Sequence, residues 1–443
     1  MPSAHLPGTP PVPAGSAGSA GEAAARAARD GYGRLLALLA AGSGDIPAAE
    51  DALGDAFERA LTTWVRDGIP DSPECWLLTV ARNRLKDHWK SAATRTGVPL
   101  DPARHDALHL DDVDPDAVGD RRLELMLVCA HPAIDPDIRT PLMLNTVLGF
   151  TAAQIAGALA VTPTALAARL VRAKRRIKEA RIPFVIPDRT VLPVRLAHVL
   201  EAVYGAYAID WPIGGTQQRP AMAGEALHLA ETLAGLLPRD SEVHGLAALI
   251  CLAAARAPAR VNGDGELVPL GEQDPALWDT SLIARGHEHL RVVHATRSLG
   301  RFGLEAAIQA VHCARRDTGT TDWRVLLDLH RSLHALAPSL GSSTALATVT
   351  AEVEAPEAGL ALLDELGERG ARFQPAWATR AHLLERLDHT AGAVAAYDKA
   401  VSLTTDPLER RHLERRRASL SGRTAGRASG PASGGCYAGP VAE

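Results

Sequence analysis

Residues 151–178 constrain the fold more than any other stretch of the chain, because they predict two short helices joined by a tight turn. Thr151 is a suitable N-cap for the first helix. Thr162 caps the second helix, and Pro163 occupies its first position, where the missing N–H costs nothing and the fixed φ is already helical. The turn contains Ala160, at a position where glycine is common. The stretch therefore predicts a helix-turn-helix.

In the second helix of this pair, apolar residues recur with the helical period, which predicts an inward seam of Leu166, Leu170, Ala173 and Ile177. The opposite face is basic. An α-helix fits the major groove of DNA and brings its N-terminal residues to the base edges, whereas later basic residues meet phosphates. We therefore assign Thr164, Ala165, Ala168 and Arg169 to base edges, and Arg172, Lys174, Arg175 and Arg176 to phosphates. A solvated basic helix is the alternative.

An acidic amphipathic helix is predicted over residues 48–64. Its apolar stripe consists of Leu53, Phe57, Ala60, Leu61 and Trp64, and its acidic side chains are Glu50, Asp51, Asp55 and Glu58. Because an acidic face repels phosphates, it either stays solvated or binds a basic protein surface.

A second helix in the same block is predicted over residues 74–90, with Leu77, Ala81, Leu85 and Trp89 on one face. Another face carries Arg82, Lys86 and Lys90, with Asn83 adjacent. This spacing follows a phosphate backbone, so these four residues are candidate DNA contacts.

The whole chain is predicted to be all-α, because alanine and leucine dominate and aromatic residues make up only 4% of the 443 residues. A chain of this length is longer than one compact hydrophobic core usually supports, so several domains are expected. After residue 188, paired amphipathic helices recur, and residues 375–403 come close to a tetratricopeptide pattern. The expected divisions are a flexible N-terminus (1–21), a first helical block (22–97), an acidic linker (98–122), a second helical block (123–187), a helical extension (188–420) and a flexible tail (421–443).

The sequence contains no motif that indicates catalysis or the binding of a cofactor or metal, and we therefore expect no catalytic residues, cofactor or metal. Cys129 and His131 are interpreted as a buried structural pair, and residues 262–265 as a hairpin turn. His287, His289 and His294 are interpreted as surface histidines.

A net charge of -5 limits DNA contact to local basic patches. No apolar run predicts a membrane span, so a cytoplasmic protein is expected. The five cysteines, which form no CxxC pair, are expected to be buried thiols.

The motifs together resemble extracytoplasmic-function (ECF) sigma factors of the sigma-70 family. Residues 45–57 look like the region-two helix that docks on the clamp helices of the largest RNA polymerase subunit. Residues 76–87 are similar to the helix that engages and melts the −10 element, and residues 66–73 correspond to the preceding base-binding loop. Residues 151–178 match the region-four reader of the −35 element. Further similarity to the subgroup with a long tetratricopeptide-like extension lies in residues 129–132, 169–184, 256–268, 272–278 and 306–312.

The resemblance implies two small helical sigma domains, regions 2 and 4, followed by the extension. It implies an alternative sigma factor whose partners are core RNA polymerase and promoter DNA, with an intramolecular or protein partner for the extension. Residues 204–211 and 343–348 depart from the family's pattern. Two other classes stay open: a helix-turn-helix regulator with a helical-repeat sensor domain, and a helical-repeat adaptor that binds only protein.

Overall fold

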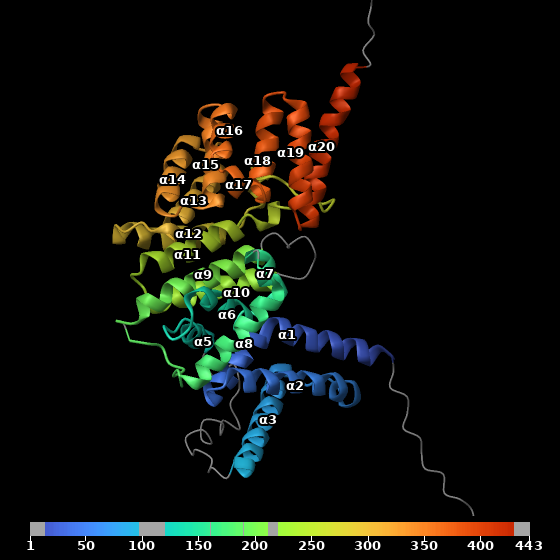
Figure 1. Cartoon of the computed structure of the whole chain (residues 1–443), viewed down its shortest axis with the longest axis vertical. Helices are drawn as coiled ribbons and strands as arrows, with labels where there is room; N and C mark the ends of the chain where they lie inside the picture. Colours follow the sequence, from blue (N-terminus) through green and yellow to red (C-terminus); the bar gives the residue numbers. More distant parts are fainter. Residues whose placement is uncertain (1–13, 97–119, 160, 189, 211–219, 429–443) are drawn as a thin grey trace, which may run out of the picture. The chain divides into compact units, whose positions relative to one another are not determined.

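The computed structural model describes residues 14–96, 120–159, 161–188, 190–210 and 220–428. Over these ranges the regular elements are helices, with one isolated antiparallel bridge between Val261 and Leu267 (Figure 1). The all-α prediction is confirmed. The chain divides into two compact units, residues 1–210 with 220–229 and residues 211–219 with 230–443, which are described separately.

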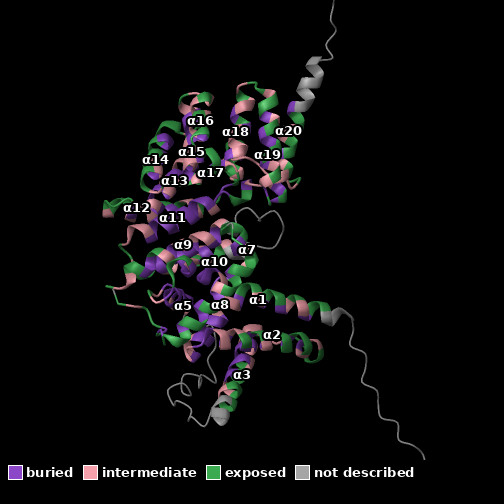
Figure 2. Ribbon diagram, in the orientation of Figure 1, coloured by how far each residue is buried: buried purple, intermediate pink, exposed green. Residues whose placement is uncertain are grey.

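The first unit begins with three helices that pack on one another, α1 (Ala14–Ser43), α2 (Ile46–Asp67) and α3 (Pro73–Thr96). Helix α1 starts earlier than expected, since residues 14–21 were predicted to be flexible and are helical; their alanines favour the helix. Asp45 caps α2 by accepting a hydrogen bond from the Ala48 N–H at 3.2 Å. The shared core, purple in Figure 2, includes Leu35, Leu53, Trp64 and Leu77.

The predicted apolar stripe of α2 is correct except at Leu61. Leu53, Ala60 and Trp64 are buried and Phe57 is half-buried, but Leu61 is 51% exposed. Leu61 follows Ala60 directly, and one residue turns a helix by about 100°, which carries its side chain out of the core. In α3, Leu77, Ala81 and Leu85 are buried as predicted, and Trp89 is half-buried.

The rest of the first unit is a second group of helices. Arg139 on α6 donates to the Ile134 carbonyl at 2.9 Å and lies 3.0 Å from His198 Nε2 on α9. Arg195, also on α9, donates to the Leu127 carbonyl of α5 at 3.1 Å. Helix α9, which sequence reasoning assigned to the extension, therefore packs on the helices before it. The group comprises α5 (Arg122–Cys129), α6 (Pro136–Thr146), α7 (Ala152–Leu159), α8 (Pro163–Glu179), α9 (Leu192–Asp210) and the first part of α10 (Pro220–Leu236).

The second unit is a succession of helices that pack on their neighbours in the chain, as the repeated amphipathic pattern predicts. Glycines permit the closest approaches between these helices. A Cβ on Gly245, for example, would lie only 2.6 Å from the backbone nitrogen of Gly303. The predicted pair at residues 375–403 forms two helices around Ala381, Ala396 and Tyr397. The helices are α11 (Ser241–Ala254), α12 (Thr280–Thr296), α13 (Arg301–Thr318), α14 (Trp323–Leu336), α15 (Leu340–Val353), α16 (Pro356–Asp364), α17 (Gly367–Gly370), α18 (Gln374–Arg386), α19 (Thr390–Leu403) and α20 (Pro407–Ala428), with 3₁₀ turns at Ala257–Ala259, Leu270–Glu272 and Pro275–Leu277.

One helical stretch of the described chain, Ser241–Ala259, is long and apolar enough to cross a membrane by length and composition. Its apolar window is 78% buried, as in the core helix of a folded domain. Helices α7 and α8 pass the same test only when the pair, bent by 115°, is counted as one span.

Candidate nucleic-acid and protein interface

Two short helices, α7 and α8, form where the sequence predicts the two helices of a helix-turn-helix. Thr151 and Gln154 cap α7 reciprocally, since the Gln154 N–H donates to Thr151 Oγ1 at 3.3 Å and the Thr151 N–H donates to Gln154 Oε1 at 2.9 Å. Thr162 adopts the extended N-cap conformation before Pro163, but its side chain makes no capping hydrogen bond. Ala160 lies outside the described residues.

Helix α8 buries the predicted seam of Leu166, Leu170, Ala173 and Ile177. Most of the proposed DNA-contacting residues lie on its exposed side. Arg169 is half-exposed, and its Nη2 lies 3.7 Å from Asp135 Oδ2. The exposed members are Thr164, Ala165, Ala168, Arg172, Arg175 and Arg176.

A concave surface of about 270 Å³ lies between α8 and residues 133–138. Arg169, Arg172 and Arg176 line it, together with Asp135 from the turn before α6. Three guanidinium groups facing one acidic residue give the hollow a net positive charge. Such a surface attracts an anionic backbone, and bringing a phosphate close to Arg169 would separate it from Asp135.

Lys174 differs from the other basic residues of α8, because it is buried, with 9% of its surface exposed. Its Nζ donates to Glu50 Oε1 on α2 at 2.5 Å and to Asn145 Oδ1 at 2.8 Å. A residue predicted to bind a phosphate thus pairs with a residue predicted to bind the polymerase. In this arrangement Lys174 is out of reach of DNA, and the assignment stays a prediction that requires α8 to leave α2. Lys178 makes a second link, 2.6 Å from Asp45 Oδ2.

The acidic face of α2 is only partly open. Asp51 and Glu58 are exposed, whereas Asp55 pairs with Arg84 of α3 at 2.7 Å. Sequence reasoning missed Arg84, because nothing in the local pattern indicates a partner on another helix. A groove of about 570 Å³ follows this face and is lined by Asp45, Pro47, Ala48, Asp51, Ala52, Asp55, Arg84, Leu85, Asp87, His88, Ser91 and Lys178.

The proposed DNA-contacting residues of α3 differ in their exposure. Asn83 and Lys90 are exposed, and Lys86 is half-buried. Arg82 is only 8% exposed, so it lies against the helical bundle rather than on an open stripe. The first two residues of the predicted base-binding loop, 66–73, belong to the end of α2, where Arg66 donates twice to the Asp67 carboxylate at 2.7 Å. Gly68, which follows, has a φ of 90°. The acidic linker, residues 98–122, lies outside the described residues except for its last three positions.

Cys129, at the end of α5, is fully buried, as predicted. Burial raises the pKa of its thiol to about 12, an effect that Lys174 opposes and Glu50 reinforces. Burial, then the charges of Arg195 and Arg139, lowers the pKa of His131, whose Nδ1 accepts from the Ala133 N–H at 3.1 Å. Cys129 is thus a buried thiol that keeps its proton at pH 7, whereas His131 is only half-buried and has a neutral imidazole, so their role as a structural pair stays a prediction.

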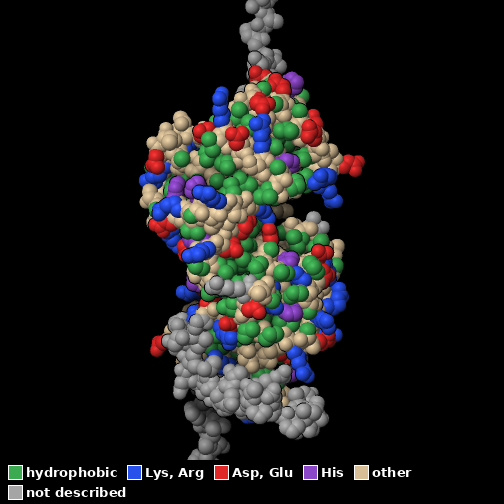
Figure 3. Space-filling model, turned by 90° about the vertical axis from the view of Figure 1, so that its left-hand side faces the viewer, with side chains coloured by type: hydrophobic (Ala, Val, Ile, Leu, Met, Phe, Trp, Pro, Cys, Tyr) green, Lys and Arg blue, Asp and Glu red, His purple; other side chains and the backbone are tan. Residues whose placement is uncertain are grey.

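On the face drawn in Figure 3, basic and acidic side chains are interspersed and do not form one large field of a single sign. This agrees with the net charge of -5 and with a DNA contact confined to local patches.

Comparison with known proteins bears on both parts of the chain. Residues 29–95 match the family described as sigma-70 region 2, and residues 195–294 match a family of unknown function, DUF6596. The uncharacterized protein R00370 of Rhizobium meliloti is 32% identical over 382 residues, which cover 83% of this chain and 89% of that protein. The probable ECF RNA polymerase sigma factor SigI of Mycobacterium tuberculosis is 35% identical over 143 residues, 31% of this chain and 49% of that protein. No solved structure matches the chain.

Proposed function

The chain belongs to the ECF group of the sigma-70 family, and from this premise we propose that it is an alternative sigma subunit that binds core RNA polymerase and selects promoters through their −10 and −35 elements. One observation carries the proposal. The three-helix bundle that matches region 2 shares a compact unit with a capped helix whose exposed side is basic. A sigma factor needs both parts in one chain.

The polymerase contact is proposed for α2. Asp51 and Glu58 offer exposed negative charge, and the exposed Leu61 adds apolar surface on the same helix. Acidic side chains around an apolar residue suit a basic protein surface, for which the family implies the clamp helices of the largest subunit. Glu50 belongs to the same proposed surface but is held by Lys174 in this structure.

The DNA contacts are proposed for α3 and α8. In α3, Asn83, Lys86 and Lys90 would follow the −10 strand, and Arg82 would contribute only after moving from its buried position. In α8, the first turn would reach base edges of the −35 element, and Arg172, Arg175 and Arg176 would bind phosphates.

The proposal is tested by measuring core binding and promoter-directed transcription separately. The double variant Asp51→Ala/Glu58→Ala should weaken binding to core polymerase by about 10-fold, because it removes two exposed charges from the proposed contact. Arg172→Ala/Arg176→Ala should leave core binding intact and reduce −35-dependent transcription by about 10-fold or more. Glu357→Ala and Arg324→Ala, exposed charges on α16 and α14, are the matched controls.

A chain that does not bind core polymerase is not a sigma factor. If it then bound specific DNA alone, it would be a helix-turn-helix regulator with a helical-repeat sensor domain, whereas an adaptor would bind neither. For the extension we propose a regulatory, tetratricopeptide-like protein-binding role, because helix pairs of this kind present a surface to partners. We expect the protein to work in the cytoplasm, without catalytic activity of its own.

A further inference from the structure

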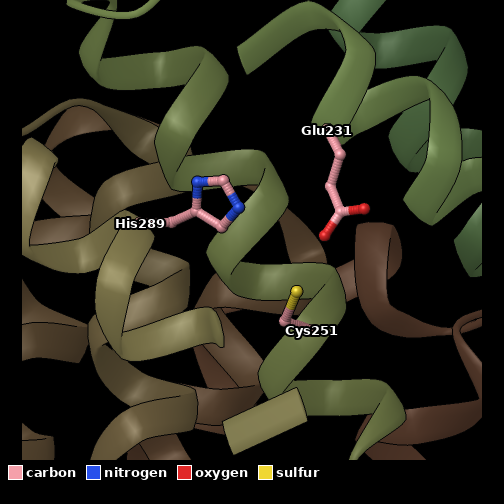
Figure 4. A group of neighbouring side chains, drawn as sticks. All are labelled: Glu231, Cys251 and His289. Carbon is pink, nitrogen blue, oxygen red and sulfur yellow. The ribbon is translucent and has the colours of Figure 1, made fainter. Parts of the chain in front are cut away.

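Three side chains with different ligand atoms meet in the second unit. They are Glu231 on α10, Cys251 on α11 and His289 on α12, and one donor atom from each lies within 4.8 Å of the other two. Figure 4 shows that the three side chains extend from their separate helices toward one another. Cys251 is buried, and the other two are half-buried.

Close packing of α12 on α11 brings His289 to this position. Gly286 lies one turn earlier on α12, and a Cβ there would be 2.6 Å from Leu252 Cγ and 3.4 Å from the Ala248 carbonyl oxygen. A glycine at this point lets the two helices approach, and residues three apart share a helix face. His289 is therefore directed toward α11. The interpretation of His289 as a surface histidine is wrong, although His287 and His294 are exposed as expected.

The second ring nitrogen of His289 is already held. Its Nδ1 lies 2.9 Å from Nδ1 of His244, so one imidazole donates and the other accepts. The remaining nitrogen, Nε2, faces the side of Glu231 and Cys251 (Figure 4). Metal-bound histidines commonly use one nitrogen for the ion and hold the other with a hydrogen bond. Burial, followed by the charge of His244, lowers the pKa of His289, which keeps the imidazole in the neutral form that binds metals.

Without a metal, the charges of the cluster are already compensated. Glu231 forms an ion pair with Arg285 of α12. Burial, then the Glu231 carboxylate, raises the pKa of the Cys251 thiol to about 12, so the sulfur carries its proton. A divalent cation would replace that proton, which leaves for solvent, and no oxidation or reduction is involved. The cation would then face one thiolate and one carboxylate, which together balance its charge, and Arg285 would remain near the carboxylate.

We propose that this cluster is a Zn²⁺ site in which Glu231, Cys251 and His289 supply three ligands. Thiolate and imidazole select zinc over magnesium or calcium, which prefer oxygen ligands. Zinc–ligand bonds of about 2.0 to 2.3 Å place neighbouring donors less than about 4 Å apart, so the donors need to converge by about 1 Å. The fourth position of a tetrahedral ion would be open to water or another ligand.

The site is tested by titrating Co²⁺, and then Zn²⁺, into the full-length chain after treatment with a chelator. We expect one Co²⁺ per chain with a thiolate-to-cobalt charge-transfer band, and Zn²⁺ should displace it. Cys251→Ser should abolish the band, and His289→Gln should weaken binding by at least about 10-fold, as should His244→Phe through the lost hydrogen bond. The matched controls are Cys313→Ser, a buried cysteine on α13, and His287→Gln, an exposed histidine on α12.

Folding is checked for each variant by circular dichroism in the presence of chelator. Because Cys251 is fully buried, Glu231→Gln, at a half-buried position, provides a second variant, which should weaken binding while the chain stays folded. A folded wild-type chain that binds neither ion overturns the proposal, and so does a charge-transfer band that survives Cys251→Ser. Neither measurement involves polymerase, so the result is independent of the proposed sigma function.

Discussion

At the scale of single residues, the pair formed by Lys174 and Glu50 is the main departure from the sequence-based assignment. Lys174 was assigned to the phosphate contacts because of its positive charge. In the helix, however, it follows Leu166 and Leu170 at intervals of four residues, which places it on the buried side of α8. The helical period therefore contained the correct signal. Its partners, Glu50 and Asn145, could not be found from the sequence, because no local pattern connects positions so far apart.

Removing the charge of Glu50 should destabilise the first unit, because the buried Lys174 would lose the carboxylate that balances its charge. We expect Glu50→Gln to lower the free energy of unfolding by about 1 to 3 kcal/mol. Asp51→Asn, at an exposed neighbouring position, should change it by less than about 0.5 kcal/mol. Chemical denaturation of the full chain measures both values.

A double-mutant cycle with Lys174→Met separates the pair from other effects of Glu50. If the two side chains interact in solution, the double variant should be more stable than the sum of the single losses predicts, since no buried charge is left unpaired. Strictly additive losses would mean that Lys174 and Glu50 do not interact in solution.

At the scale of elements, the sequence predicted best what depends on neighbouring residues. The Thr162-Pro163 start of α8, its buried seam and the α7 cap at Thr151 are present as expected, because caps and periodicity act within one or two turns. Exposure was less predictable. Arg82 of α3 is buried, and Leu61 of α2 is exposed, since both depend on which helices lie against them.

The two ends of the proposed reading face of α8 should differ in their response to salt. Arg172→Ala removes one phosphate contact and should reduce the slope of log affinity against log salt concentration by about 1. Arg169→Ala should instead reduce discrimination at one −35 position by about 1 to 3 kcal/mol and leave the slope nearly unchanged. Titrating promoter binding of the reconstituted holoenzyme with salt, on matched and substituted −35 sequences, measures both quantities.

Asp135→Asn provides a further control for Arg169, because it removes the nearby acidic residue and leaves α8 intact. It should strengthen DNA binding slightly without changing the preferred sequence. Equal effects of Arg169→Ala and Arg172→Ala on the slope and on discrimination would refute the division between base-edge and phosphate contacts.

At the scale of the whole molecule, the domain boundary predicted between residues 187 and 188 falls between helices that in fact pack on one another. Helix α9 buries Leu196, Val199 and Val203 within the first unit, and Arg195 and His198 add polar contacts to α5 and α6. Sequence reasoning ended the domain at the prolines near residue 187, but α8 already ends at Glu179, and the end of a helix does not show what packs beyond it. The first unit includes α9 and the start of α10.

Two truncated chains distinguish the structural role of α9 from the proposed regulatory role of the extension. A chain ending at residue 187 loses α9, and exposing its buried partners should destabilise the first unit by several kcal/mol, at about 1.5 to 3 kcal/mol for each large apolar side chain. A chain ending at residue 236 keeps α9 and all of α10, so it should remain folded by circular dichroism. Transcription by the longer truncation, compared with the full chain, then measures regulation alone: a change in either direction supports a regulatory extension, and equal activity contradicts it. If the shorter truncation were as stable as the longer one, α9 would not belong to the first unit, and loss of activity in either chain could then be assigned to the extension itself.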